Sequence, residues 1–128
     1  MRRILIAAAA ACLAGCATPA RFDATEQLAY ATLWQQAWHL EQACSGGPRS
    51  PAAERARLGA MATGAELLGA YLEYQADTGS REILRAFTEL LVAVGDVSGR
   101  SAAYCRESAA NLQEAAGRAL QVNGGRRR

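Results

Sequence analysis

Four cysteines carry the most reactive side chains of this 128-residue chain, at positions 12, 16, 44 and 105. A thiol can carry a covalent group, bind a metal or form a disulfide with a second cysteine. Cys44 and Cys105 are too far apart for the clustered spacing of zinc sites, and the chain has no Cys-x-x-Cys-His sequence for haem attachment. The chemistry expected of each cysteine therefore depends on the segment that carries it.

Side chains suited to catalysis occur without the partners that catalysis needs. His39 is the single histidine, and no nucleophile-elbow sequence accompanies it. Glutamates recur seven residues apart at 66 and 73, 82 and 89, and 107 and 114. No Glu-x-x-His is present and arginines lie three or four residues from several of these acids, which favours solvent-exposed ion pairs over a di-iron site. We therefore expect a protein that is not an enzyme and holds no metal or cofactor.

Aromatic residues are the candidates for contact with a protein partner: Tyr30, Trp34, Trp38, Tyr71 and Tyr74. The first three follow one another at intervals of about one helical turn, and the other two lie on the next expected helix. Aromatic side chains at the edge of an apolar stripe commonly close a core. Tryptophan and tyrosine are also enriched where proteins bind one another, so both interpretations stay open.

The first 16 residues have the organisation of an export signal. Arg2 and Arg3 precede an apolar run from Ile4 to Leu13. This run is about half the roughly 20 residues that a membrane-spanning helix needs. It ends in Leu13-Ala14-Gly15-Cys16, an aliphatic residue and two small ones before a cysteine. This tetrapeptide resembles the lipobox of bacterial lipoprotein precursors.

The resemblance implies cleavage before Cys16, attachment of a diacylglycerol to its thiol, and acylation of the new N-terminus. Residues 1–15 are then a discarded signal peptide that includes Cys12, and residues 16–22 are a lipidated tether. Two or three acyl chains, at about 0.8 kcal/mol per buried methylene, make such an anchor effectively permanent. Ala17 stands where enterobacterial-type lipoproteins carry an inner-membrane retention Asp, which favours the periplasmic face of the outer membrane.

The composition of the remaining chain argues against nucleic acid as a partner. All 14 basic residues are arginines, and removal of Arg2 and Arg3 leaves 12 arginines against 12 acidic residues. Such a chain has no basic face for a phosphate backbone, and the expected compartment holds no such partner. The 113 residues from Cys16 to Arg128 suffice for one domain with a modest core.

Apolar residues recur at intervals of three and four in four segments, which predicts four helices. The first begins at Asp23, which has capping-box spacing to Glu26, and ends near Cys44. The second begins after Ser50 and ends near residue 76. A break at 77–80 precedes the third, whose amphipathic stripe is the clearest. A turn at 95–99 precedes the fourth, which extends to about residue 122.

Helices of ordinary length joined by short turns predict an antiparallel up-down-up-down four-helix bundle over residues 23–122, followed by a basic tail at 123–128. In this topology Cys44 and Cys105 lie at the same end of adjacent helices. In an oxidising periplasm we expect them to form a disulfide rather than to remain as two buried thiols.

These features together favour a non-enzymatic, lipid-anchored protein that binds an envelope or secreted protein, as an immunity protein, an inhibitor or a secretion accessory does. The short tether reaches only about 20 Å when extended, so the domain stays close to the membrane. The alternative is a periplasmic carrier of a small apolar ligand. Its apolar pocket would lie between helices and be lined by Leu68, Leu72, Phe87 and Leu91.

Overall fold

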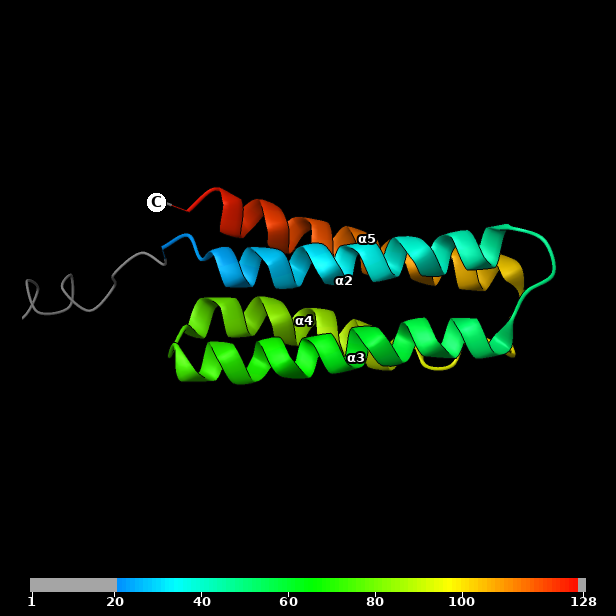
Figure 1. The fold of residues 1–128 in the computed structure, drawn as a ribbon, viewed down its shortest axis with the longest axis horizontal. Coiled ribbons are helices and arrows are strands. Elements are labelled where there is room, and N and C mark those ends of the chain that lie inside the picture. Colours follow the sequence, from blue (N-terminus) through cyan, green and yellow to red (C-terminus); the bar gives the residue numbers. More distant parts are fainter. Residues whose placement is uncertain (1–20, 127–128) are drawn as a thin grey trace, which may run out of the picture.

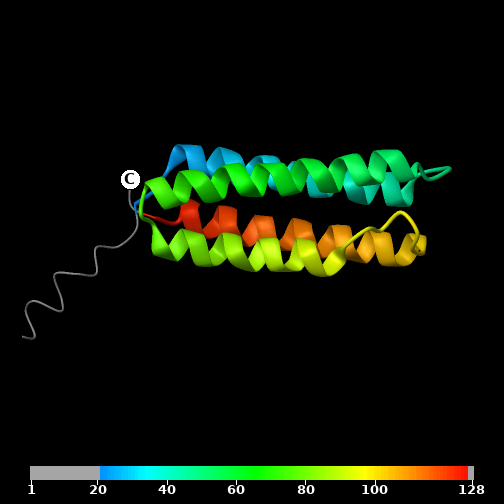
Figure 2. The same cartoon turned by 90° about the horizontal axis from the view of Figure 1, so that it is seen from below.

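The computed structural model of the protein describes residues 21–126. Four helices make up most of this part of the chain: α2 (Ala24–Ser45), α3 (Pro51–Tyr74), α4 (Thr78–Val94) and α5 (Ala102–Gly124). Each runs antiparallel to the one before it, along a common long axis (Figure 1). The view turned by 90° pairs α2 with α3 above and α4 with α5 below (Figure 2). The predicted antiparallel four-helix bundle is therefore confirmed.

The helices form a closed ring in which each contacts two neighbours. α2 packs on α5 and α3, and α4 packs on α3 and α5. The contact between α2 and α5 is the most extensive, whereas α4 is the least extensively packed of the four helices. We call the end of the bundle that contains Asp23 and Asp77 the tether end, and the opposite end, which contains Cys44 and Cys105, the disulfide end.

Each helix begins with a side chain that accepts a hydrogen bond from a backbone N–H of the first turn. Such a cap typically contributes about 1 kcal/mol to stability. The four N-cap residues are Asp23, Ser50, Asp77 and Ser101. The cap at Asp77 corrects one expectation, because the predicted break at 77–80 contains the first turn of α4. Ser80 is buried in that turn, and its N–H donates to Asp77 Oδ1 at 2.9 Å.

One apolar stripe from each helix builds the core. The predicted stripe of α2 is buried as expected and comprises Tyr30, Leu33, Ala37, Leu40 and Cys44. On α5, three of the buried residues are alanines, Ala109, Ala116 and Ala119. Their small side chains are consistent with the extensive packing of α5 on α2. Tyr104 and Ala115 of the same helix are only half-buried.

The glycines within α3 have different surroundings. A Cβ atom at Gly64 would lie 3.2 Å from Leu33 Cδ2, and one at Gly69 would lie 3.6 Å from Leu84 Cδ2. A Cβ at Gly59 would meet nothing within 4 Å. Close packing of α3 on α2 thus gives a reason for glycine at Gly64, but packing gives none at Gly59.

None of the described helices combines the length and the apolarity that crossing a membrane requires. The predicted signal peptide at 1–15, Cys12, Cys16 and the tether up to residue 20 lie outside the described residues, as do Arg127 and Arg128. The described chain begins at Arg21, at the same end of the bundle as its last residues (Figure 1).

Candidate functional site

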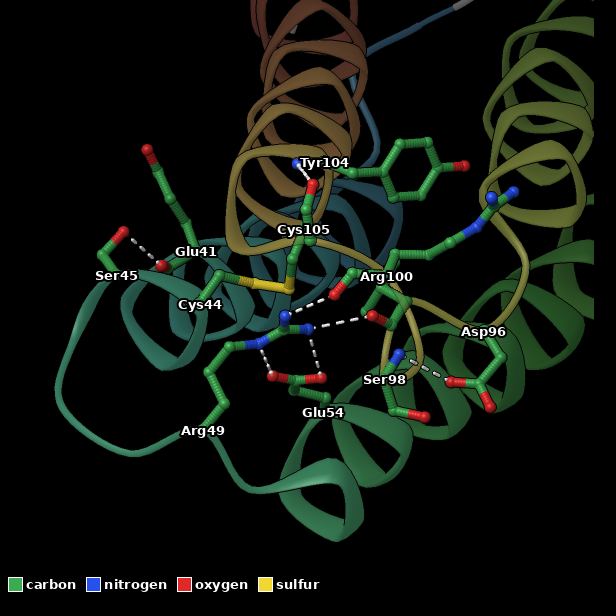
Figure 3. Close-up of a disulfide and its surroundings, with 12 residues drawn as sticks. Glu41, Cys44, Ser45, Arg49, Glu54, Asp96, Ser98, Arg100, Tyr104 and Cys105 are labelled. Carbon is green, nitrogen blue, oxygen red and sulfur yellow. Dashed lines mark hydrogen bonds and ion pairs between the residues drawn. A yellow bond between two sulfur atoms is a disulfide. The ribbon is translucent and has the colours of Figure 1, made fainter.

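Cys44 and Cys105 are joined by a disulfide, as the sequence predicts. The bond links the last turn of α2 to the first turn of α5, and the Cα atoms are 5.7 Å apart (Figure 3). Both cysteines are buried. A bond in this position holds two helix ends together and closes the most extensive helix pair of the bundle.

An ion pair between the half-buried Arg49 and the buried Glu54 lies beside the disulfide (Figure 3). Arg49 Nε and Nη2 donate to the two carboxylate oxygens of Glu54 at 2.7 and 3.0 Å, and Glu54 is completely buried. The same guanidinium donates to the carbonyl oxygens of Val97 and Arg100. Arg49 therefore ties the α2–α3 loop to the first turn of α3 and to the α4–α5 connection.

Metal-ligand side chains also meet at this end. Ligand atoms of Cys44, Glu54 and Cys105 lie within 4.8 Å of one another. The two sulfur atoms are bonded to each other, and both carboxylate oxygens accept hydrogen bonds from Arg49. These contacts already use the ligand atoms, so the geometry of the oxidised protein supports a structural role for the group.

A second buried ionic cluster closes the tether end. Arg126 Nη1 lies 2.9 Å from Glu26 Oε2 and 3.5 Å from Asp77 Oδ2, and Nη2 donates to Ser80 Oγ at 2.7 Å. Burial raises the pKa of Glu26 above its ordinary value, even though Arg126 acts in the opposite direction. Burial also acts to raise the pKa of Asp77, but hydrogen bonds from Ser80 and the charge of Arg126 outweigh it and leave that pKa lowered.

As far as the structure describes them, the residues predicted as a basic tail pack on the bundle. Asn123 is buried, and its Nδ2 donates to the carbonyl oxygen of Asp23 at 2.8 Å and to Gln27 Oε1 at 2.9 Å. α5 continues to Gly124, and the side chain of Arg126 is only 9% exposed. The bundle therefore includes residues 123–126, because their polar groups complete the first turn of α2.

Three of the five aromatic residues predicted to contact a partner do not lie together on one exposed surface. They are Tyr30, Tyr71 and Tyr74. Tyr30 is completely buried, and its hydroxyl donates to the Ser80 carbonyl at 3.4 Å, so the structure places this residue in the core. Tyr71 is half-buried, and its hydroxyl donates to Asp23 Oδ2 at 2.6 Å. Tyr74 is 86% exposed, in the last turn of α3 at the tether end.

Trp34 and Trp38 remain as neighbours on one flank of α2. Their exposed fractions are 38% and 39%. Trp34 lies over α5, since a Cβ at Gly117 would be 3.6 Å from its Cδ1 atom, and the Trp38 ring meets the His39 ring edge-on at 5.0 Å. A shallow hollow of about 460 Å³ adjoins Trp34 and is otherwise lined by α5 residues: Ala110, Gln113, Glu114, Gly117, Arg118 and Gln121. We call this region the Trp34–Trp38 surface.

A groove of about 620 Å³ lies between α3 and α4, and we call it the α3–α4 groove. Its lining includes the apolar residues Leu58, Ala62, Ala65, Leu84, Leu91 and Val92, and the charged residues Glu66, Glu73, Arg81 and Arg85. Of the four residues predicted to line an apolar pocket, Leu91 contributes to it. Leu68, Leu72 and Phe87 are buried in the core instead. The apolar stripe of each helix shows which residues form the core. It does not show between which two helices a groove opens, because that depends on how the helices pack.

No protein-family model, curated protein or solved structure matches the chain. In the described residues, the protein is a disulfide-linked antiparallel four-helix bundle in which, at each end, an arginine pairs with a buried glutamate.

Proposed function

We propose that the protein is a non-enzymatic lipoprotein, anchored by lipid on Cys16 to the periplasmic face of the outer membrane, that binds an envelope or secreted protein. The observation that carries the binding proposal is the pair Trp34 and Trp38, each more than a third exposed on neighbouring turns of α2. Partly exposed tryptophans on a folded surface match the residue type that dominates binding energy at protein interfaces.

The surroundings of the two tryptophans support this assignment. The hollow beside Trp34 offers hydrogen-bonding side chains, including Gln113 and Gln121, around an aromatic centre. An apolar centre with a polar rim is the usual anatomy of a protein interface. α2 and α5, which carry this surface, are joined by the disulfide at one end and by Asn123 and Arg126 at the other. A surface held in this way loses little conformational entropy when a partner binds.

The contacts of three buried or half-buried acids support a non-enzymatic role. Glu26, Glu54 and Asp77 each interact with an arginine that joins helix ends. These acids therefore have a structural use in the bundle, and the proposal assigns them none in catalysis.

Anchoring rests on the resemblance of Leu13–Cys16 to a lipobox. The described chain begins at the tether end, so a lipid on Cys16 sets that end next to the membrane. Trp34 and Trp38 then lie about 16 and 22 Å along α2 from Asp23, at 1.5 Å per residue. A partner must therefore approach close to the membrane surface.

Capture from detergent-solubilised envelopes tests the binding proposal. The tagged full chain is compared with a Trp34→Ala/Trp38→Ala variant and with a Tyr74→Ala control, which removes an exposed aromatic ring elsewhere. We expect at least one protein captured by the parent and the control to be lost with the double variant, while circular dichroism and melting of the purified variants stay similar. An identical set of captured proteins for all three contradicts the role of the two tryptophans.

A second candidate function is favoured by the α3–α4 groove, whose lining is mainly apolar. A groove of about 620 Å³ falls within the size range of small-molecule sites, so the protein would be a carrier of a small apolar ligand. Native mass spectrometry of protein extracted in mild detergent tests this candidate. A stoichiometric lipid adduct that Val92→Arg removes favours a carrier, and the absence of any adduct contradicts it.

A further inference from the structure

The α3–α4 groove leaves apolar side chains in solvent along the least extensively packed helix of the bundle. Val92 is 76% exposed, and Leu58 is half-buried on the opposite wall. The neighbouring wall residue Ala62 is exposed as well. These residues form an apolar strip near the disulfide end of the groove.

The tether half of the same groove carries opposite charges on its two walls. Glu66 and Glu73 lie on α3, whereas Arg81 and Arg85 lie on α4. Within the described part of the chain, Glu66, Glu73 and Arg81 take part in no ion pair, and Arg85 reaches only Glu89 of its own helix, at 3.7 Å. The groove thus presents an acidic wall and a basic wall that do not neutralise each other.

Antiparallel packing sets these groups at matching heights. Glu73 and Arg81 both lie within about one turn of the tether end. Glu66 and Arg85 both lie about 10 to 12 Å from it, and Leu58 and Val92 about 21 to 24 Å from it. Glu66 and Glu73 on the α3 wall therefore each have an arginine of α4 at their own level, and Leu58 has Val92 at its level.

We propose that a second copy of this chain covers the groove, related by a twofold axis parallel to the helices. Such an axis sets α3 of one copy on α4 of the other at equal height. Glu73 then faces Arg81 of the second copy, Glu66 faces Arg85 of the second copy, and the two apolar strips meet. Burial of the apolar strips supplies most of the affinity, and the exposed charge pairs set the alignment.

A twofold axis perpendicular to the helices fits the positions of the apolar and charged residues less well. It reverses one copy, so Val92 would lie beside Arg85 of the second copy instead of beside an apolar residue. It would also put the two tether ends at opposite ends of the dimer, which a common membrane does not allow. This last step rests on the proposed anchor at Cys16, whereas the pairing of the grooves does not depend on it.

Charge reversal of one wall tests the pairing. The chain with Glu66→Arg/Glu73→Arg has two basic walls, and the chain with Arg81→Glu/Arg85→Glu has two acidic walls. Each should repel its own copy, and a mixture of the two should form a mixed dimer. Full-length protein in mild detergent is measured by analytical ultracentrifugation, with differently tagged chains to identify the mixed species. A control, Glu107→Arg/Asn111→Arg, adds positive charge at two exposed positions of α5 outside both surfaces.

We expect the parent and the α5 control to dimerise, each reversed chain alone to dimerise about tenfold or more weakly, and the mixture to regain parent affinity. A monomeric parent chain overturns the proposal, and so does a reversed chain that dimerises as well as the parent. A monomer with a stoichiometric lipid in native mass spectrometry also overturns it, in favour of a carrier. Loss of envelope capture with Trp34→Ala/Trp38→Ala is measured separately, so failure of the dimer and failure of partner binding remain distinguishable.

Discussion

Arg126 and Glu26 form an ion pair of 2.9 Å at the tether end, although 100 residues separate them in the sequence. The pair joins the last described residue to the first turn of α2, and its carboxylate is only 1% exposed. Asp77 and Ser80 of α4 bind the same guanidinium. One arginine therefore holds three helix ends together.

Removal of this arginine should destabilise the protein. Arg126→Ala leaves Glu26 buried without its cation, and breaking a buried pair in this way typically costs about 3 kcal/mol. Urea denaturation of the variant measures the loss. Arg106→Ala, an exposed position on the same helix, is the control and should change the unfolding free energy by less than about 0.5 kcal/mol. Equal effects of the two substitutions contradict a structural role for the Arg126–Glu26 pair.

The two acids of this cluster should give the stability opposite dependences on pH. The folded-state pKa of Glu26 is raised above 4.5, so the folded chain binds this proton more tightly than the unfolded chain. Glu26 therefore adds stability as the pH falls from its raised pKa toward 4.5. The folded-state pKa of Asp77 is lowered below 3.8, so its contribution is present above 3.8 and is lost as the pH falls toward the lowered value.

Unfolding free energies from pH 7 to pH 3 measure both contributions. Glu26→Gln should remove the stabilisation on the way down to about pH 4.5, and Asp77→Asn, which keeps a capping side chain, should reduce the loss below about pH 3.8. Parallel pH profiles for the parent chain and both variants would mean that neither acid has a shifted pKa.

Loss of the disulfide should lower stability by an amount that grows with the logarithm of the length of the loop that it closes. Cys44 and Cys105 are 61 residues apart, and the chain-entropy treatment gives about 4 kcal/mol for a loop of this length, less any native strain. Cys44→Ala/Cys105→Ala should therefore melt clearly below the oxidised parent. The reduced parent should resemble the variant, and identical melting curves for oxidised and reduced protein contradict a stabilising bond.

Two glycines of α3 offer a comparison within one helix. Gly59→Ala introduces a methyl group with nothing within 4 Å, so it should gain up to about 1 kcal/mol from helix propensity. Gly64→Ala places the methyl group 3.2 Å from Leu33 Cδ2, and the side-chain shift that this requires should reduce or cancel the gain. Thermal unfolding of both variants checks the difference. A larger gain at Gly64 than at Gly59 contradicts the packing of α3 on α2.

Lipidation at Cys16 has a direct biochemical readout. Cys16→Ser removes the thiol, so cells should accumulate a precursor of higher mass without the covalent lipid. The parent should partition into the detergent phase of a Triton X-114 extraction, and its mass should include the acyl chains. A parent chain that carries no lipid on Cys16 contradicts the lipobox interpretation, while the Cys44–Cys105 bond serves as the folding control in both proteins.

The apolar periodicity of the sequence was sufficient to predict the helices and the topology. It also predicted the disulfide, because short turns fix which helix ends lie together. The same pattern indicates that Tyr30 is buried, because Tyr30 lies on one apolar stripe with Leu33 and Ala37. The role of Arg126 could not be predicted. An arginine that follows two glycines has no neighbour in the sequence that indicates its buried acidic partner, which lies 100 residues away.

The flanks of the helices were predicted less well than their buried faces. A stripe shows which residues point inward, but the neighbour that each flank meets depends on the order of helices around the ring. Tyr71 and Trp34 illustrate this, because Tyr71 reaches Asp23 across the α2–α3 contact while Trp34 lies against α5. Tyr30 therefore lies in the core, and the other four aromatic residues do not share one side of the bundle.

The contact of Asn123 with Asp23 brings the two ends of the described chain together. A short peptide joining residue 126 to residue 21 would therefore close the bundle into a ring with little strain. New chain ends could then be opened in the Gly46–Pro48 loop, provided that Arg49 is kept. In the natural order of elements, residue 126 leaves the bundle beside residue 21, whereas an affinity tag inserted in that loop stands a helix length away, about 33 Å from them.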